Sequence, residues 1–274
     1  MALASCRRSV TGVLTSACRS VDVTRSLSRN LFFPSRIVER PLTTTSRMAD
    51  TIADPTQRKL MQEQCLLVDE NDEIVGHASK LDCHRRVNIE ANGMLHRAFS
   101  VFLFNSKGEL LLQERADSKV TFPGYVTNTC CSHPLYVEDE MINEPLALGV
   151  KRAAQRRVNY ELGVPLDQLP LESFNFLARV HYRAMSGGDW GEHEMDYVLF
   201  MQKDVDLAPN DNEVRKVEYV SLDDFPNYLE KCKASGVPVT PWFDLIGKNL
   251  LTTWWKRLDS IGSIANSEEI HRYV

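Results

Sequence analysis

The chain has 274 residues, of which 43% are hydrophobic and 25% are charged. This balance is typical of a globular protein that is long enough to bury a sizeable core. No run approaches about 18 consecutive apolar residues, so we expect no transmembrane segment. The seven cysteines are odd in number and irregularly spaced, which favours reduced thiols over a disulfide framework.

The first 47 residues differ from the rest of the chain in charge. They hold eight Arg, no Lys and two acids, a net charge of +6, whereas the whole chain carries −5 and the remainder therefore −11. A segment rich in Arg, Ser and Thr and nearly free of acids is typical of an organelle transit peptide. We therefore expect residues 1–47 to be a basic presequence without fixed structure that directs the protein to mitochondria. A basic tail without a targeting role is the alternative. If translation starts at Met48, we expect a cytoplasmic or peroxisomal product.

Two pairs of strands are predicted in the first half of the chain, after a polar linker or helix at residues 48–64. Residues 65–69 and 74–78 are short apolar segments on either side of an acidic turn. Residues 98–104 and 110–115 are longer apolar segments separated by Asn-Ser-Lys-Gly, which predicts a hairpin.

Irregular segments and one clear helix follow these strands. Residues 79–95 are polar and irregular, and residues 117–145 contain three prolines, so we expect loops with brief strands there. Residues 146–162 place apolar side chains at helical spacing, and Gly163 supplies a stop.

The second half of the chain alternates strand and helix signals. The mixture predicts an α/β (α+β) fold in which helices flank a mixed β-sheet sandwich. We expect strands at residues 174–182, 194–201 and 217–221, and helices at residues 222–234 and 245–260.

Several side chains have residue types suited to metal binding. His84, His96 and His133 lie in or beside irregular segments, but isolated histidines are more often surface or satisfied core residues. Glu192 and Glu194 are two apart on a predicted strand and should face the same side, where a cation or a shared proton would relieve their repulsion. A solvated strand edge is the alternative explanation.

A thiol and a helical carboxylate are further candidates. Cys131 lies two residues before His133 in a loop bounded by proline, although a buried and inert cysteine is the more common case. Glu161 has the phase of the apolar face of its helix. A buried carboxylate there needs either an arginine or a metal as partner.

Taken together, these segments resemble type I isopentenyl-diphosphate delta-isomerase, a family with a Nudix-like fold. The resemblance covers residues 80–243 in the family's order. It is carried by the strings LDCH (81–84), LHRAFSVFLFN (95–105), LLLQERADSK (110–119), FPGYVTNTCCSHP (122–134), GVKRAAQRRVNYELGV (149–164), HYRA (181–184), WGEHEMDYVLF (190–200) and TPWF (240–243).

The resemblance implies roles that spacing alone does not assign. It implies a divalent cation (Mg, Mn or Zn) held by His84, His96, His133, Glu192 and Glu194, and a Mg²⁺ that arrives with the substrate diphosphate and corresponds to Glu161. It implies that Cys131, Glu194 and Tyr182 are catalytic. It also implies that the diphosphate contacts Lys80, Arg115, Lys119 and Ser132, and that Trp242 covers the reacting carbons.

The predicted helix is similar to a Nudix box that has lost most of its acids. Glu161 and Gly163 are kept, whereas Arg157 and Tyr160 stand where a Nudix hydrolase would have acids and Leu148 replaces an upstream Glu. Pyrophosphate hydrolysis needs that carboxylate cluster to hold metals and activate water. A Nudix-type diphosphate hydrolase is therefore the second hypothesis, and a non-catalytic mitochondrial binding protein is the third.

The resemblance predicts an isomerase of isoprenoid biosynthesis that interconverts isopentenyl and dimethylallyl diphosphate through a tertiary carbocation-like state. The expected partner is a small prenyl diphosphate, and we expect a monomer that binds no nucleic acid, in keeping with the acidic body. We expect a single catalytic domain at residues 65–262, with a Nudix-like core at about 94–247, and a C-terminal tail at residues 263–274.

Overall fold

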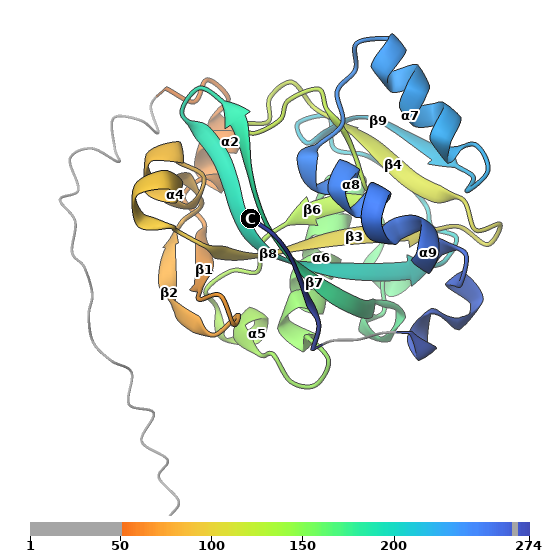
Figure 1. The fold of residues 1–274 in the computed structure, drawn as a ribbon, viewed down its shortest axis with the longest axis horizontal. Helices are drawn as coiled ribbons and strands as arrows, with labels where there is room; N and C mark the ends of the chain where they lie inside the picture. The colour runs from red at the N-terminus through yellow and green to blue at the C-terminus, as the bar shows by residue number, and fades with distance from the viewer. Residues whose placement is uncertain (1–50, 265–267) are drawn as a thin grey trace, which may run out of the picture. The chain divides into compact units, whose positions relative to one another are not determined.

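The computed structural model describes residues 51–264 and 268–274 (Figure 1). The presequence predicted for residues 1–47 and the second start at Met48 lie outside the described residues. Among the helices that are described, none combines the length and the apolar character needed to cross a membrane.

A mixed sheet organises the described part of the chain. Its main path runs in the order β10-β7-β8-β3-β1-β2, β6 pairs with β3, and β4 connects to β5 and β9. The strands are β1 (Gln64–Val68), β2 (Ile74–Ser79), β3 (His96–Phe104), β4 (Leu110–Arg115), β5 (Val126–Thr127), β6 (Cys130–Ser132), β7 (Asn175–Gly187), β8 (Trp190–Gln202), β9 (Val214–Val220) and β10 (Ile270–Tyr273).

The strand pair predicted at residues 65–69 and 74–78 is confirmed. The hairpin predicted at residues 98–104 and 110–115 is wrong, because its two strands pair only next to the turn. Strands β1 and β2 pair antiparallel. Strands β3 and β4 both form but meet only where Phe104 faces Leu110. Every residue of β3 is buried, so both of its faces are covered. It therefore lies inside the sheet, parallel to β8 along its full length, while β4 turns away to pair with β9.

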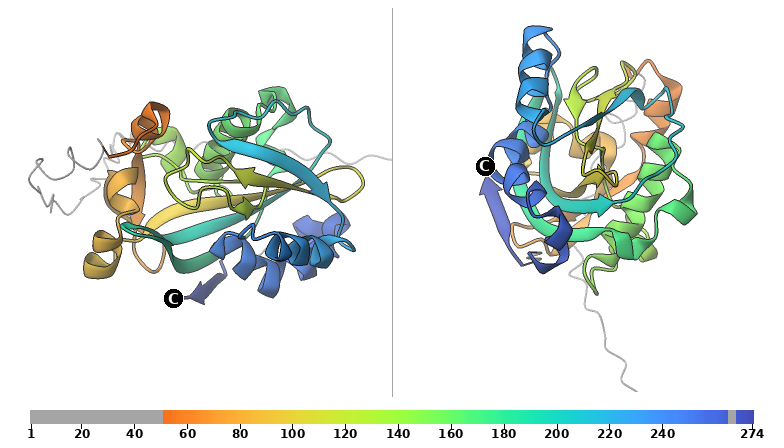
Figure 2. Two further views of the ribbon diagram at one scale, coloured as in Figure 1. Left: turned by 90° about the horizontal axis from the view of Figure 1, so that it is seen from above. Right: turned by 90° about the vertical axis from the view of Figure 1, so that its right-hand side faces the viewer.

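Helices cover both sides of the sheet. They are α2 (Pro55–Leu60), α3 (Lys80–Cys83), α4 (Arg86–Asn92), α5 (Glu138–Met141), α6 (Leu148–Leu162), α7 (Phe225–Ala234), α8 (Pro241–Ile246) and α9 (Thr252–Trp255). Figure 2 shows α6 on one side of the sheet and the C-terminal helices on the other. One apolar core joins α6 to β3 and β8, and a second joins α7, α8 and α9 to the opposite face. The predicted mixed-sheet sandwich flanked by helices is confirmed.

Two predicted segments differ in detail, and a third is confirmed. Residues 79–95 are not irregular throughout, because Ser79 caps the short helix α3 and α4 follows it. The helix expected at 245–260 is broken: α8 begins at Pro241, a π-helical turn follows, and α9 ends at Trp255. Helix α6 forms as predicted and ends at Gly163, whose φ of +67° suits a residue without a side chain.

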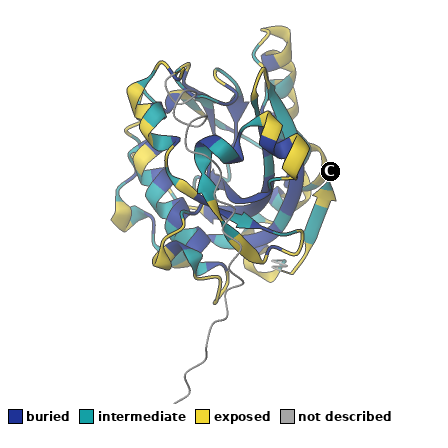
Figure 3. Cartoon of the chain, turned by 90° about the vertical axis from the view of Figure 1, so that its left-hand side faces the viewer, coloured by how far each residue is buried: buried dark blue, intermediate teal, exposed yellow. Residues whose placement is uncertain are grey.

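Both ends of the described chain pack against the catalytic domain that was expected at residues 65–262. The supposed C-terminal tail ends in β10, which pairs parallel with β7. Within residues 48–64, expected to be a polar linker or helix, Gln57 of α2 donates a hydrogen bond to the Glu213 carboxylate at 3.0 Å. Figure 3 shows the burial that results, with the central strands largely buried and exposure concentrated on outer turns and helix faces. Both segments therefore pack against the rest of the described chain.

Candidate active site

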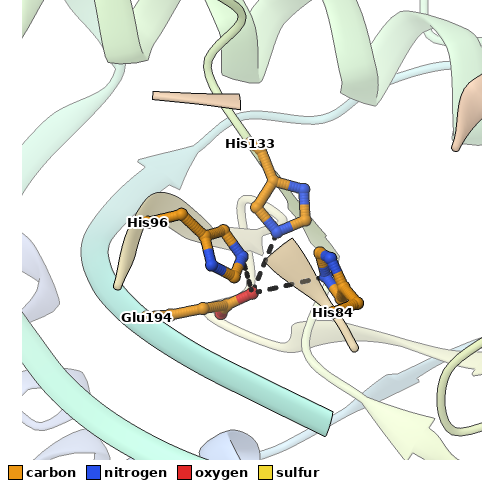
Figure 4. Close-up of side chains that lie close together, drawn as sticks. All are labelled: His84, His96, His133 and Glu194. Atoms are coloured by element: carbon orange, nitrogen blue, oxygen red, sulfur yellow. Dashed lines mark hydrogen bonds and ion pairs between the residues drawn. The ribbon is translucent and has the colours of Figure 1, made fainter. Parts of the chain in front are cut away.

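Three buried histidines and one buried glutamate lie close together. One ligand atom from each of His84, His96, His133 and Glu194 lies within 4.8 Å of every other (Figure 4). Glu194 Oε1 lies 2.9 Å from His133 Nε2, 3.3 Å from His96 Nε2 and 4.0 Å from His84 Nε2. The three imidazole rings surround this oxygen, with centroids 4.8 to 4.9 Å apart.

The sheet register brings these side chains together. His96 opens β3 and is paired directly with Glu194 on β8. Residues paired across neighbouring strands project to the same side of a sheet, so both point into the cluster. His84 ends α3, and His133 directly follows β6, the strand paired with β3 on its other side.

The cluster fits a divalent cation. All four residues are at most 6% exposed. Among these four residues, buried ring nitrogens without any hydrogen-bond partner remain at His84 Nε2, at both nitrogens of His96 and at His133 Nδ1. Such unpartnered buried atoms are rare in proteins unless an unseen group completes them. His84 Nδ1 lies 2.7 Å from the Lys80 carbonyl and must donate to it, which leaves Nε2 free as a ligand atom.

The protonation states of the cluster also suit a cation. Burial lowers the pKa of His84, and it lowers the pKa of His133 to about 3. Both rings are therefore neutral at physiological pH and offer a lone pair. Burial alone would raise the pKa of Glu194, but the hydrogen bond from His133 and the nearby His96 ring outweigh it and hold that pKa well below its usual range. Imidazole and carboxylate ligands together suit Zn or Mn and tolerate Mg.

The structure does not bring Glu192 into this group. Its carboxyl group lies 3.0 Å from the Tyr182 hydroxyl and accepts a hydrogen bond from the Thr121 hydroxyl at 3.1 Å. Burial, followed by the charge of Glu194, raises the pKa of Glu192 to about 7. Glu192 therefore lies beside the cluster of four and not among its closest ligand atoms.

Tyr182 links the two glutamates. Its hydroxyl lies 2.5 Å from Glu194 Oε2 and 3.0 Å from Glu192 Oε2. A phenol has one hydrogen and can donate it to one carboxylate only, so the second contact requires a proton on the other carboxyl group. Glu192, with its raised pKa, is the group suited to hold that proton. The two carboxylates thus face the same side of β8, as their spacing predicted.

Cys131 shares a face of the sheet with the cluster. It is paired with Ser100 of β3, four residues beyond His96 and on the same side of the strand. Its sulfur lies 3.0 Å from the indole nitrogen of Trp242, which is buried. Cys130 projects from the opposite face, where its sulfur lies 3.5 Å from Glu161. Burial, followed by the charge of Asp196, raises the pKa of Cys131 to about 12.

A second group of charges surrounds the residues expected to contact diphosphate. Lys119 pairs with Glu213, and Arg157 bonds Glu161 at 2.6 Å and Glu213 at 3.2 Å. Burial lowers the pKa of Lys80, and the charges of Lys119 and Arg157 lower it further. The three cations therefore lie close enough to influence one another.

The remaining predicted residues take separate places. The buried carboxylate of Glu161 forms an ion pair with Arg157 and is not one of the four clustered ligand residues. Arg115 lies against Trp242, with 5.8 Å between the guanidinium carbon and the ring centroid. Ser132 is buried on β6 beside Phe99, whose side chain belongs to the core on the α6 side.

Two residues of this region were not predicted from the sequence. Glu213 lies in a polar loop and shows no spacing signal, because its partners are far away in sequence. Asn128 lies within FPGYVTNTCCSHP, and its side chain contacts Cys131 and Trp242. Only its position three residues before Cys131 could have indicated a role.

Comparisons with known proteins show the family of this chain. The NUDIX domain family matches residues 94–243. The chain is 48% identical to isopentenyl-diphosphate Delta-isomerase I of Clarkia breweri over 92% of this chain and 88% of that protein. It is 48% identical to isopentenyl-diphosphate Delta-isomerase 1 of Bos taurus, covering 80% and 96%. It is also 48% identical to a protein of Cannabis sativa named isopentenyl-diphosphate Delta-isomerase 1, chloroplastic, covering 82% and 79%. The chain belongs to the isopentenyl-diphosphate Delta-isomerase family and carries its NUDIX domain.

Proposed function

We propose that this protein interconverts isopentenyl diphosphate and dimethylallyl diphosphate by moving one carbon–carbon double bond. The observation that carries the proposal is the placement of Cys131 and Glu194 on strands that flank β3, on the same face of the sheet. One proton must be delivered to the terminal alkene carbon and another removed from the allylic carbon. A thiol and a carboxylate on either side of the substrate meet this need.

The resting protonation states support both roles. The Cys131 sulfur carries its proton at physiological pH because burial raises the pKa of the thiol to about 12. The Glu194 carboxylate is ionised and accepts a hydrogen bond from the Tyr182 hydroxyl. One member of the pair can therefore give a proton while the other takes one. Tyr182 orients the carboxylate during the exchange.

A tertiary carbocation-like state needs a dry and electron-rich pocket. The indole of Trp242 is 2% exposed, and its ring lies 6.2 Å from that of Tyr182. A desolvated aromatic face stabilises a cation above it by about 2 kcal/mol. An anion about 4 Å from the cation stabilises it by roughly 4 kcal/mol at an effective dielectric constant near 20. Neither contribution suffices alone, so placement of the acid and the base must supply much of the remainder.

The diphosphate would be held by a group of cations. We assign this role to Lys80, Arg115 and Lys119, with Ser132 as a hydrogen-bond donor, because cations and donors offset the charge of the ligand. We assign the resident cation to His84, His96, His133 and Glu194, with Glu192 beside them, and the Mg²⁺ of the substrate to Glu161. A divalent ion would supply fixed positive charge beside the Glu194 carboxylate.

A Nudix-type diphosphate hydrolase is the alternative function. Hydrolysis would need several carboxylates on α6 to hold metals and position water. Arg157 stands at one of those positions and donates a hydrogen bond to Glu161. The helix therefore carries a neutral ion pair where a hydrolase would have a cluster of carboxylates. This arrangement favours isomerisation.

One assay separates the two functions. The purified protein is incubated with isopentenyl diphosphate and Mg²⁺, and the reaction is followed by proton NMR and by a phosphate-release assay. We expect dimethylallyl diphosphate to form without phosphate release. Released phosphate with no movement of the double bond would favour the hydrolase and overturn the proposal.

For location, we propose that residues 1–47 direct the protein to mitochondria, which rests on their charge. Fluorescent fusions that begin at Met1 and at Met48 test this. Mitochondrial signal from the first and cytosolic signal from the second is the expected result, and diffuse signal from both would contradict it. We further propose that the protein is a monomer, which light scattering after size exclusion tests directly.

A further inference from the structure

We propose that Asn128 is a positioning residue that fixes the direction of the Cys131 thiol hydrogen. The role in turnover rests on the proposed isomerase function, whereas the hydrogen-bond arrangement does not. Asn128 lies in the turn between β5 and β6 and is fully buried. No pattern in the sequence assigns it a task.

The orientation of the Asn128 amide is fully determined by its neighbours. Its side-chain nitrogen lies 3.0 Å from the carbonyl of Val101 and 3.2 Å from the carbonyl of Cys130. Carbonyl oxygens can only accept, so the NH₂ group must face them. The amide oxygen therefore has to face the other way, toward Cys131.

That oxygen is surrounded by donors. It lies 2.9 Å from the Cys131 sulfur, 3.1 Å from the indole nitrogen of Trp242 and 3.0 Å from the hydroxyl of Thr127. Because an amide oxygen cannot donate, the thiol must supply the hydrogen of the first contact. The S–H bond of Cys131 therefore points at Asn128.

The other neighbours of the sulfur are compatible with this direction. The single indole N–H hydrogen of Trp242 is shared between the Asn128 oxygen at 3.1 Å and the sulfur at 3.0 Å, so at the sulfur it meets a lone pair. The hydroxyls of Ser100 and Thr127 lie farther away, at 3.8 and 3.7 Å. Asn128 and Trp242 together thus hold the sulfur in one rotamer, with its hydrogen and one lone pair both directed.

This arrangement matters for proton transfer because a small displacement of a reacting group is costly. A misplacement of about 1 Å can lower the rate about 10²-fold. The side-chain hydrogen bonds of Asn128 go to the Cys131 thiol and its surroundings and not to the assigned diphosphate contacts Lys80, Arg115 and Lys119. Its loss should therefore lower kcat about 10²-fold and leave KM for isopentenyl diphosphate almost unchanged.

A purely structural role of Asn128 makes a different prediction, and the same turn offers a matched control. The Thr129 hydroxyl accepts from the Leu103 amide at 2.8 Å and donates to the Leu111 carbonyl at 2.6 Å. Thr129 is as buried as Asn128 and does not bond the thiol. Thr129→Val therefore removes comparable anchoring of the turn and leaves the S–H bond untouched.

The test is the S–H stretching band of Cys131 in the full-length protein without substrate. Raman difference spectra against Cys131→Ser isolate this band from those of the other thiols. We expect Asn128→Ala to move it to higher wavenumber because the hydrogen bond is lost. Thr127→Val should move it to lower wavenumber, because a competing donor to the amide oxygen is removed. Thr129→Val should leave the band in place.

An unshifted band in a folded Asn128→Ala protein would overturn the proposal, as would an equal shift in Thr129→Val. If Asn128→Ala does not fold, Thr127→Val decides, and the absence of a shift there refutes the proposal. A loss of kcat in Asn128→Ala no greater than in Thr129→Val would refute the role in turnover. The spectrum needs no turnover. A wild-type protein that failed to isomerise would therefore disprove the proposed function and leave the band assignment intact.

Discussion

Replacing Glu213 by glutamine should destabilise the fold strongly. Glu213 Oε2 bonds both Lys119 and Arg157, and its Oε1 accepts from Gln57 at 3.0 Å. The side chain of Glu213 is 0% exposed, and those of the two cations are 7% and 3% exposed. The uncharged amide of the variant would leave Lys119 buried without a counter-charge, and Arg157 would keep only Glu161.

The magnitude follows from the pKa of Glu213. Burial alone would raise this pKa, but Lys119 and Arg157 outweigh it and lower the pKa from 4.5 to about 2. At about 1.36 kcal/mol per unit, the shift corresponds to about 3 kcal/mol of stability. Removing one partner of a buried ion pair typically costs about 3 to 5 kcal/mol, which agrees. Because the folded pKa is the lower one, this stabilisation is complete above pH 4.5 and is lost as the pH falls toward 2.

Urea unfolding of the wild type and of Glu213→Gln, measured from about pH 7 down to about pH 3, tests this. We expect a difference of about 3 kcal/mol at neutral pH that shrinks below about pH 4.5. The control is Glu218→Gln, which removes an exposed pair with Lys216 and should cost less than about 1 kcal/mol. Equal stability of Glu213→Gln and Glu218→Gln, or a Glu213→Gln difference that does not change with pH, would refute the reasoning.

Three further predictions concern the cluster. His96→Ala should retain less divalent metal than the wild type in elemental analysis of protein prepared without chelator, and equal metal content would contradict the ligand assignment. Tyr182→Phe removes a hydrogen bond to a carboxylate that is worth about 1.5 to 3 kcal/mol, so kcat should fall roughly 10- to 100-fold; unchanged kcat would exclude its role in orienting Glu194. The pKa of His133 is lowered from 6.5 to about 3, so the unfolded state takes up this proton first and metal-free protein should lose stability as the pH falls from 6.5 to 3. In urea unfolding, the metal-free His133→Asn protein should lose less stability than the wild type over this pH range. If the two proteins lose the same stability, His133 is not the source of the pH dependence.

The sequence predicted those elements that depend on interactions between residues close together along the chain. Helix α6 follows from apolar side chains at helical spacing and from a glycine that can adopt a positive φ at its end. The expected hairpin of β3 and β4 failed because proximity along the chain does not decide strand pairing. The two edges of β3 are instead hydrogen-bonded to β8 and β6, which come from other parts of the chain, and the two apolar cores cover its faces.

The site illustrates the same limit. His84, His96 and His133 show no ligand spacing, because they come from three separate elements: the end of α3, the start of β3 and the residue after β6. The resemblance to a family named these residues where their spacing could not. Glu213 escaped prediction altogether, since its bonds to Lys119 and Arg157 cross 94 and 56 residues.

Turnover of isopentenyl diphosphate by three single variants tests the central claim most directly. Cys131→Ser and Glu194→Gln alter the two groups that share the site face, whereas Cys130→Ala alters the neighbouring thiol on the opposite face. With folding verified by circular dichroism, we predict near-complete loss of dimethylallyl diphosphate formation in the first two and a mild effect in the third. Near-normal turnover in Cys131→Ser or in Glu194→Gln would contradict the account.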